Sequence, residues 1–185
     1  MRESMKQGLL AALACATALT ACSATVAQSG PRSAAAASSI PDGDWRAINR
    51  DLAATRFSPL DDINKSNVSQ LAEAWTYPLR GFNTAVPLVI GGTMYISVAN
   101  RVVALDADTG AEVWVHEEPR PAGQGPGPGG VSGRGVGYWA GDGSHAPRIL
   151  VMAGNRMIAL DAATGEKVPG FGDGGEINVG VGYGG

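Results

Sequence analysis

RVVALDADTGAEVW, residues 101–114, is the most informative stretch of the sequence, because most of it returns as RMIALDAATGEKVP at residues 156–169. The two copies are 55 residues apart (156 − 101). When residues 99–113 are aligned with residues 154–168, nine of the fifteen positions are identical. An internal repeat of this kind is typical of propellers and solenoids, in which each unit buries its apolar face against the next.

Each copy has the pattern of a β-hairpin. Residues 102–105 form an apolar run that suits a strand buried on both faces. Asp106 ends the run, because its carboxylate can accept the backbone N–H groups two and three residues further on. Gly110 supplies the positive φ of a type I turn with a G1 bulge, so the chain returns antiparallel. Trp114 lies on the returning strand, where its large ring can cover a neighbouring unit.

Two other patterns in this region resemble ligand sites. The spacing of Asp106, Asp108 and Gly110 is similar to the start of a calcium loop, but the glutamate that closes such a loop is missing, which favours a plain turn. A G-x-G-x-x-G sequence that begins at Gly125 contains prolines and has neither the preceding strand nor the following helix of a nucleotide site. Residues 118–133, rich in Pro and Gly, are therefore predicted to form a surface loop.

The N-terminus has the pattern of a bacterial export signal. Two basic residues precede an apolar run, residues 8–21, that is too short to span a bilayer comfortably. The run ends in Leu-Thr-Ala-Cys, which resembles a lipobox, so Cys22 is predicted to carry lipid and to begin the mature protein. Ordinary cleavage after Ala27, with Cys22 incidental, is the alternative. We expect a periplasmic protein anchored to a membrane through this lipid.

The chain is predicted to have three parts. Residues 1–22 are the signal with its lipobox, residues 23–41 a flexible tether rich in Ala and Ser, and residues 42–185 a folded domain. The 27 glycines and 11 prolines favour turn-rich β structure over a helical bundle. The net charge of −3 offers no basic surface, so nucleic acid is not an expected partner.

The part of the domain around the repeats is predicted to be one short helix followed by strands. Asn67 is expected to cap the helix, with Val68 and Leu71 on its buried side. Four stretches have the composition of strands, the second and third of them joined by a Gly-Gly turn: AWTYPL (74–79), VPLVI (86–90), TMYISV (93–98) and PRILVMAG (147–154).

Six stretches, taken in order, resemble the N-terminal part of quinoprotein dehydrogenases that use pyrroloquinoline quinone (PQQ), of the glucose, polyol and alcohol dehydrogenase type. They cover nearly all of the predicted domain: DWRAINRDLAATRFSPLDDIN (44–64), NVSQLAEAW (67–75), VPLVIGGTMYI (86–96), ALDADTGAEVW (104–114), RGVGYW (134–139) and ALDAATGEKVPGFGDGGE (159–176).

The resemblance implies an all-β fold, an eight-bladed propeller of four-stranded sheets with PQQ and a calcium ion at its axis. This chain would form about two of those blades after its short helix. In the family the repeat is the motif whose tryptophan locks adjacent blades. Because Pro169 stands where the second copy would have its tryptophan, a weaker or different docking contact is expected there. The residues that match the motif are Ala104, Asp106, Thr109, Gly110, Trp114, Ala159, Asp161, Thr164 and Gly165.

RGVGYW matches the family stretch whose arginine reaches the cofactor, which here is Arg134. PQQ is a tricarboxylate ortho-quinone, and a guanidinium can donate two parallel hydrogen bonds to such oxygens. An exposed loop arginine is the alternative interpretation. Tyr138 and Trp139 are expected to pack between blades, whereas His116 and His145 are expected at the surface.

The sequence departs from the family pattern in three respects. Pro128-Gly129 stand where many members have two adjacent cysteines, and Thr84 stands where many have a pocket glutamate. The catalytic aspartate and the calcium ligands of the family come from later blades, beyond Gly185. We therefore expect the chain to be inactive alone and to need the missing blades as partners.

Two classes of function remain open. The resemblance implies that the intact protein oxidises a sugar or alcohol and passes the electrons to a respiratory acceptor. The alternative is a non-enzymatic propeller lipoprotein of the kind that assists outer-membrane protein assembly. Such lipoproteins share the repeat and the lipobox but lack RGVGYW and the leader at residues 44–60, which favours the dehydrogenase.

Overall fold

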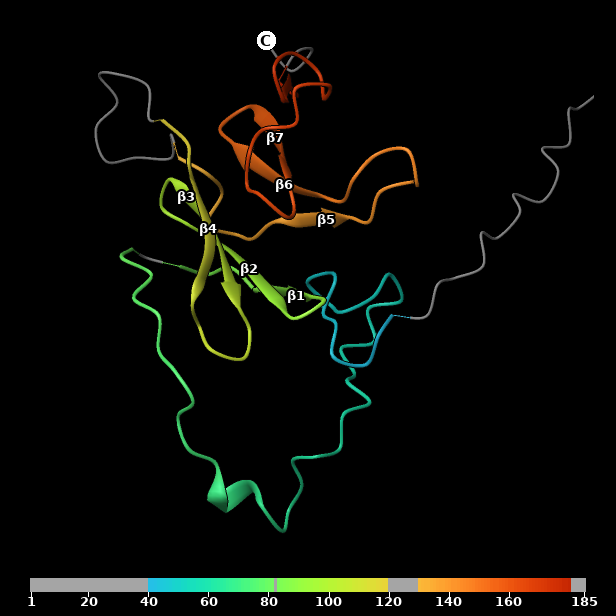
Figure 1. Cartoon of the computed structure of the whole chain (residues 1–185), viewed down its shortest axis with the longest axis vertical. Coiled ribbons are helices and arrows are strands. Elements are labelled where there is room, and N and C mark those ends of the chain that lie inside the picture. Colours follow the sequence, from blue (N-terminus) through green and yellow to red (C-terminus); the bar gives the residue numbers. More distant parts are fainter. Residues whose placement is uncertain (1–39, 82, 120–129, 181–185) are drawn as a thin grey trace, which may run out of the picture. The chain divides into compact units, whose positions relative to one another are not determined.

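The computed structural model describes residues 40–81, 83–119 and 130–180. They form two four-stranded antiparallel sheets in which the strands follow chain order (Figure 1). The expected all-β fold with about two blades is confirmed. The first sheet contains β1 (Leu88–Ile90), β2 (Thr93–Val98), β3 (Arg101–Asp106) and β4 (Glu112–Glu117). The second contains β5 (Gly137–Trp139), β6 (Arg148–Ala153), β7 (Arg156–Asp161) and β8 (Glu176–Asn178).

Both copies of the repeat form the predicted turns. One carboxylate oxygen of Asp106 accepts the N–H groups two and three residues on, at 3.1 and 2.8 Å. Asp161 does the same at 2.9 and 3.0 Å. Gly110 and Gly165 have φ values of +71° and +74°, the left-handed conformation that glycine adopts without strain. The Asp106 carboxylate is thus bonded to its own turn, as the turn interpretation requires.

Two apolar clusters lie on opposite faces of the first sheet. The cluster between the sheets includes Trp114 on one side and Ile158 on the other. The second cluster contains Val103 and Leu105, with residues of the segment 75–85 packed against it. Residues 102–105 are no more than 2 % exposed, so β3 is buried on both faces as its apolar run predicts.

The strand predicted at residues 74–79 is absent, because no strand within the described residues pairs with this segment. The segment packs on the first sheet through side chains instead. Tyr77 donates its hydroxyl to Glu112 at 2.6 Å, and Arg101 donates to the backbone oxygen of Leu79 at 2.8 Å. Its Trp, Tyr and Leu side chains join the second apolar cluster.

The short helix is the 3-10 turn η1 (Val68–Gln70), and its predicted cap and burial are wrong. The Asn67 side chain makes no bond to the helix, because its oxygen accepts the Asn64 N–H at 2.8 Å and its amide donates to the backbone oxygen of Asp62. Val68 and Leu71 are 51 % and 60 % exposed. A single turn of this kind has no face wide enough to bury.

Some predictions lie outside the described residues. These are the signal, the lipobox cysteine Cys22, almost all of the tether, and the loop residues 120–129 with Pro128-Gly129. Within the described residues, no helix has the length and apolar character needed to cross a membrane.

Candidate functional site

Each repeat turn receives a tryptophan from the segment that precedes its sheet in the chain. Trp114, at the end of the first sheet, donates its indole N–H to the backbone oxygen of Ala162 at 3.0 Å. Trp75 donates in the same way to the backbone oxygen of Ala107 at 3.1 Å. Ala107 and Ala162 hold equivalent positions in the two copies, so the two docking contacts are the same.

The tryptophan rings cover the turn glycines. A Cβ atom at Gly165 would lie 2.4 Å from the Trp114 ring, and one at Gly110 would lie 2.5 Å from the Trp75 ring. Trp114 of the first copy thus fills the turn of the second copy. The weaker or different contact expected of Pro169, which stands in the second copy where the first has Trp114, stays a prediction. Residues 74–79 therefore dock on the turn of the first sheet through Trp75, as β4 docks on the turn of the second sheet through Trp114.

Sequence reasoning missed the role of Trp75. The available signal was the shared pattern Ala-Glu-x-Trp: AEAW (72–75) precedes the first turn as AEVW (111–114) precedes the second. The two separations are unequal, 35 residues (110 − 75) and 51 residues (165 − 114), because the Pro/Gly-rich loop lies in the second.

The other motif residues lie in the turns and the core. Ala104 and Ala159 are fully buried. The Thr109 and Thr164 hydroxyls bond the aspartates of their turns at 2.7 and 3.3 Å. The hydrogen bonds from Thr109 outweigh desolvation and hold the pKa of Asp106 below its usual value.

Arg134 lies on the segment that leads into the second sheet. Its side chain is exposed, and its guanidinium makes no ion pair or hydrogen bond with the described residues. Its backbone N–H donates to the Ser132 hydroxyl at 3.2 Å. Thr84 donates its hydroxyl to the backbone oxygen of Gly133 at 3.1 Å. The structure thus brings together the two segments that the resemblance assigns to the cofactor pocket.

Arg134 and the described residues around it fit an oxygen of PQQ but provide no site for the calcium ion. An exposed guanidinium that has no partner in the described part of the chain, on a backbone held by two hydroxyl groups, suits a carboxylate or quinone oxygen. No group of three or more His, Cys, Asp or Glu side chains that could hold a metal occurs among the described residues. Arg134 is therefore a candidate cofactor ligand, whereas calcium has no candidate site in this part of the chain.

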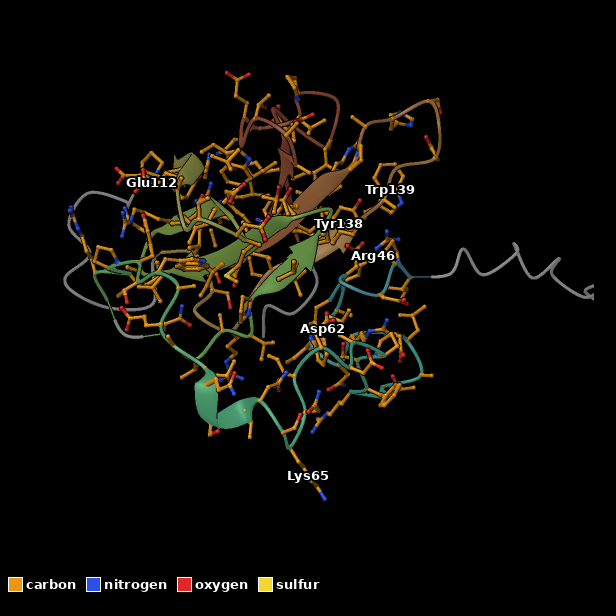
Figure 2. The ribbon with its side chains drawn as sticks, turned by 60° about the horizontal axis from the view of Figure 1, so that its bottom comes forward. Arg46, Asp62, Lys65, Glu112, Tyr138 and Trp139 are labelled. Carbon is orange, nitrogen blue, oxygen red and sulfur yellow. The ribbon has the colours of Figure 1, made fainter. Side chains whose placement is uncertain are left out.

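The two aromatic residues after Arg134 differ in their surroundings. Tyr138 packs against the cluster between the sheets, as expected. Trp139 was expected there too but stacks on Arg148 of the neighbouring strand, with the guanidinium carbon 4.9 Å from the ring centre. Figure 2 shows Arg46 beside both aromatic residues, and the three line a common pocket of about 290 Å³.

The two histidines also differ. His145 is exposed, as predicted, and contacts Asp142 at 3.0 Å. That contact and the Ser144 hydroxyl hold the pKa of Asp142 far below its usual value. His116 was expected at the surface, but its side chain is only 14 % exposed and contacts the buried Glu118 at 3.3 Å.

Glu118 is the centre of an ion cluster that joins the two sheets. Its carboxylate contacts Arg156 at 2.9 Å and Lys167 at 3.1 Å, and both cations also contact Glu176. Desolvation raises the pKa of Glu118, but the hydrogen bonds from Lys167, Arg156 and His116 outweigh it, so this pKa lies below its usual value. Sequence reasoning had no signal for this cluster, because its members are spread from residue 116 to residue 176.

Comparison with known proteins identifies the family. The family model for PQQ, described as "Glucose/ethanol/alcohol dehydrogenase, beta-propeller domain", matches residues 45–185. The chain therefore belongs to this family. Among curated relatives, it is 40 % identical to the quinohemoprotein alcohol dehydrogenase of Comamonas testosteroni, over 81 % of this chain and 23 % of the relative. It is 32 % identical to the quinoprotein glucose dehydrogenase of Gluconobacter oxydans, over 77 % of this chain and 20 % of that relative.

A solved structure shows the same fold. The crystal structure of the Comamonas testosteroni enzyme matches with a TM-score of 0.57 and 35 % identity, over 75 % of this chain and 20 % of that one. The chain thus spans about a fifth of the length of the relatives that it matches.

Proposed function

We propose that this chain is the N-terminal blade pair of a periplasmic PQQ-dependent dehydrogenase that oxidises a sugar or an alcohol. In the intact protein, further blades complete the propeller and contribute the calcium ligands and the catalytic base. The observation that carries the proposal is the exposed Arg134, whose guanidinium has no partner among the described residues, on a backbone tied to the Thr84 segment and to both sheets. Family membership supplies the reaction class.

PQQ supplies an ortho-quinone that accepts the two electrons removed from the substrate. The described residues act on binding and orientation. Arg134 would donate hydrogen bonds to an anionic oxygen of the cofactor, and the docked Trp114 holds the first sheet against the second. The segment at Thr84 adds no charge where many family members have a glutamate, so its hydroxyl serves to hold the loop of Arg134.

The experiment is a dye-linked dehydrogenase assay on the protein with its complete propeller. Oxidation of a panel of primary alcohols and aldoses should require added PQQ and calcium. The 185-residue chain should be inactive under the same conditions, because it has no candidate calcium site among its described residues. Failure of the complete protein to bind PQQ, together with co-purification with outer-membrane assembly proteins, would instead support the scaffold function.

Location is a separate part of the proposal. We expect Cys22 to be lipidated, so Cys22→Ala should move the protein from the membrane fraction to the soluble periplasmic fraction. Metabolic labelling with a palmitate analogue checks this, and Cys15→Ala is the matched control that should keep the label. Equal labelling of the Cys22→Ala variant would favour ordinary signal cleavage.

A further inference from the structure

Ser97 is a buried polar residue in an apolar strand. It lies in β2 between Ile96 and Val98, its side chain is fully buried, and its cross-strand partner is the fully buried Val102. A hydroxyl in such a place costs free energy unless it makes a hydrogen bond. Ser97 makes a short one, 2.6 Å, to the backbone oxygen of Ser132.

Ser132 connects this bond to Arg134. Its backbone N–H donates to the oxygen of Met152 in the second sheet at 2.6 Å, and its hydroxyl accepts the Arg134 N–H at 3.2 Å. The Ser97 hydroxyl therefore ties the Ser132 peptide to the first sheet, while the Met152 carbonyl ties it to the second. The backbone oxygen of Ser97 also accepts a hydrogen bond from the side-chain amide of Asn83, the residue before Thr84.

We propose that Ser97 is a positioning residue for the cofactor arginine. The guanidinium of Arg134 has no partner among the described residues, so its place is set by its backbone alone. The backbone oxygens of the two preceding residues are held by hydroxyl groups, Ser132 by Ser97 and Gly133 by Thr84. Of these two hydroxyls, that of Ser97 is buried, which makes its bond the more rigid one. The inference rests on the proposed function, because it takes Arg134 as a PQQ ligand.

The first test needs no cofactor and uses the 185-residue chain. Ser97→Cys keeps the size of the side chain but replaces a strong donor by a weak one. Amide hydrogen exchange at Ser132 and Arg134 should become about tenfold faster, as expected for the loss of one hydrogen bond. Ile96→Val, a buried change on the same strand, is the control for general loosening and should leave these two amides at the wild-type rate. Wild-type exchange in Ser97→Cys would overturn the inference.

The second test measures the PQQ dissociation constant of the protein with its complete propeller. Ser97→Cys should raise it about tenfold, and Ser97→Thr, which keeps the hydroxyl, should restore it to within about threefold. If Arg134→Ala weakens binding but Ser97→Cys does not, Ser97 is only a tie between sheets and the inference is wrong. If Arg134→Ala has no effect, the proposed role of Arg134 fails and the cofactor part of this inference fails with it, whatever the exchange rates show.

Discussion

Gly165 is restricted to glycine by two independent features. Its φ of +74° disfavours any residue with a side chain, and a Cβ would lie 2.4 Å from the Trp114 ring. Gly154, in the preceding turn of the same sheet, has a φ of +59° but open space around it. The pair therefore separates the cost of the backbone conformation from the cost of the contact.

Gly154→Ala should lower the free energy of unfolding by about 1 kcal/mol, the cost of a left-handed alanine. Gly165→Ala should cost about 2 kcal/mol more, because the methyl group displaces the docked ring. Urea unfolding of the three proteins measures the difference. Equal losses in the two variants would show that the tryptophan does not seal the turn.

Glu118 is the residue whose charge links the two sheets. Replacing it by Gln should cost about 2 kcal/mol, since Arg156 and Lys167 lose a buried partner but keep Glu176. Glu117→Gln, at an exposed neighbouring position, is the matched control and should cost less than about 0.5 kcal/mol.

The effect of Glu118 should depend on pH. Because its pKa is lower in the folded chain than in the unfolded one, its stabilisation is complete above the unfolded value of 4.5 and is lost as the pH falls through the folded value. The difference in melting temperature between wild type and Glu118→Gln should therefore shrink below about pH 4.5. A constant difference from pH 7 to pH 3 would contradict the charged cluster.

The repeat hairpin is the element that the sequence predicts best. Its information is local, because Asp106 and Gly110 define the turn and residues 102–105 define a doubly buried strand. Residues 74–79 have an equally strand-like composition but form no strand, since pairing depends on a partner that composition cannot supply. For the same reason Trp139 and His116 were misplaced: their surroundings come from residues on other strands. Arg134 was found only through family resemblance, and the hydroxyls that hold its loop were not found at all.

The tryptophan of the first repeat hairpin also stabilises the turn of the second. Trp114→Phe keeps an aromatic ring but leaves the backbone oxygen of Ala162 with one hydrogen bond fewer, a loss of about 2 kcal/mol. The oxygen also accepts the Tyr95 hydroxyl at 3.1 Å, so Tyr95→Phe with Trp114→Phe should cost more than the two single losses together. A double-mutant cycle by chemical unfolding measures this coupling. Val113→Ala, at an exposed site on the same strand, is the control and should leave the free energy of unfolding almost unchanged.

At the scale of the whole molecule, the described chain contains two sheets and one further docking tryptophan. Trp75 seals the first turn as Trp114 seals the second, so each sheet of this chain is covered by the segment before it. Leu150 of β6 and Phe171 of the loop before β8 line a pocket of about 260 Å³ together with Trp139 and Arg148. These features fit a chain that spans about a fifth of its relatives.

Whether Arg134 holds PQQ can be measured by titrating the apo-protein with PQQ and calcium. With its complete propeller, the protein should bind PQQ, and Arg134→Ala should weaken binding by about 1.5 to 3 kcal/mol, the value of a charge-assisted contact. Arg56→Ala, an exposed arginine bonded to Asn49, should bind like wild type. The 185-residue chain should bind weakly or not at all. Unchanged affinity in Arg134→Ala would show that Arg134 is not a PQQ ligand, and tight binding by the 185-residue chain would show that PQQ binding needs no further blades.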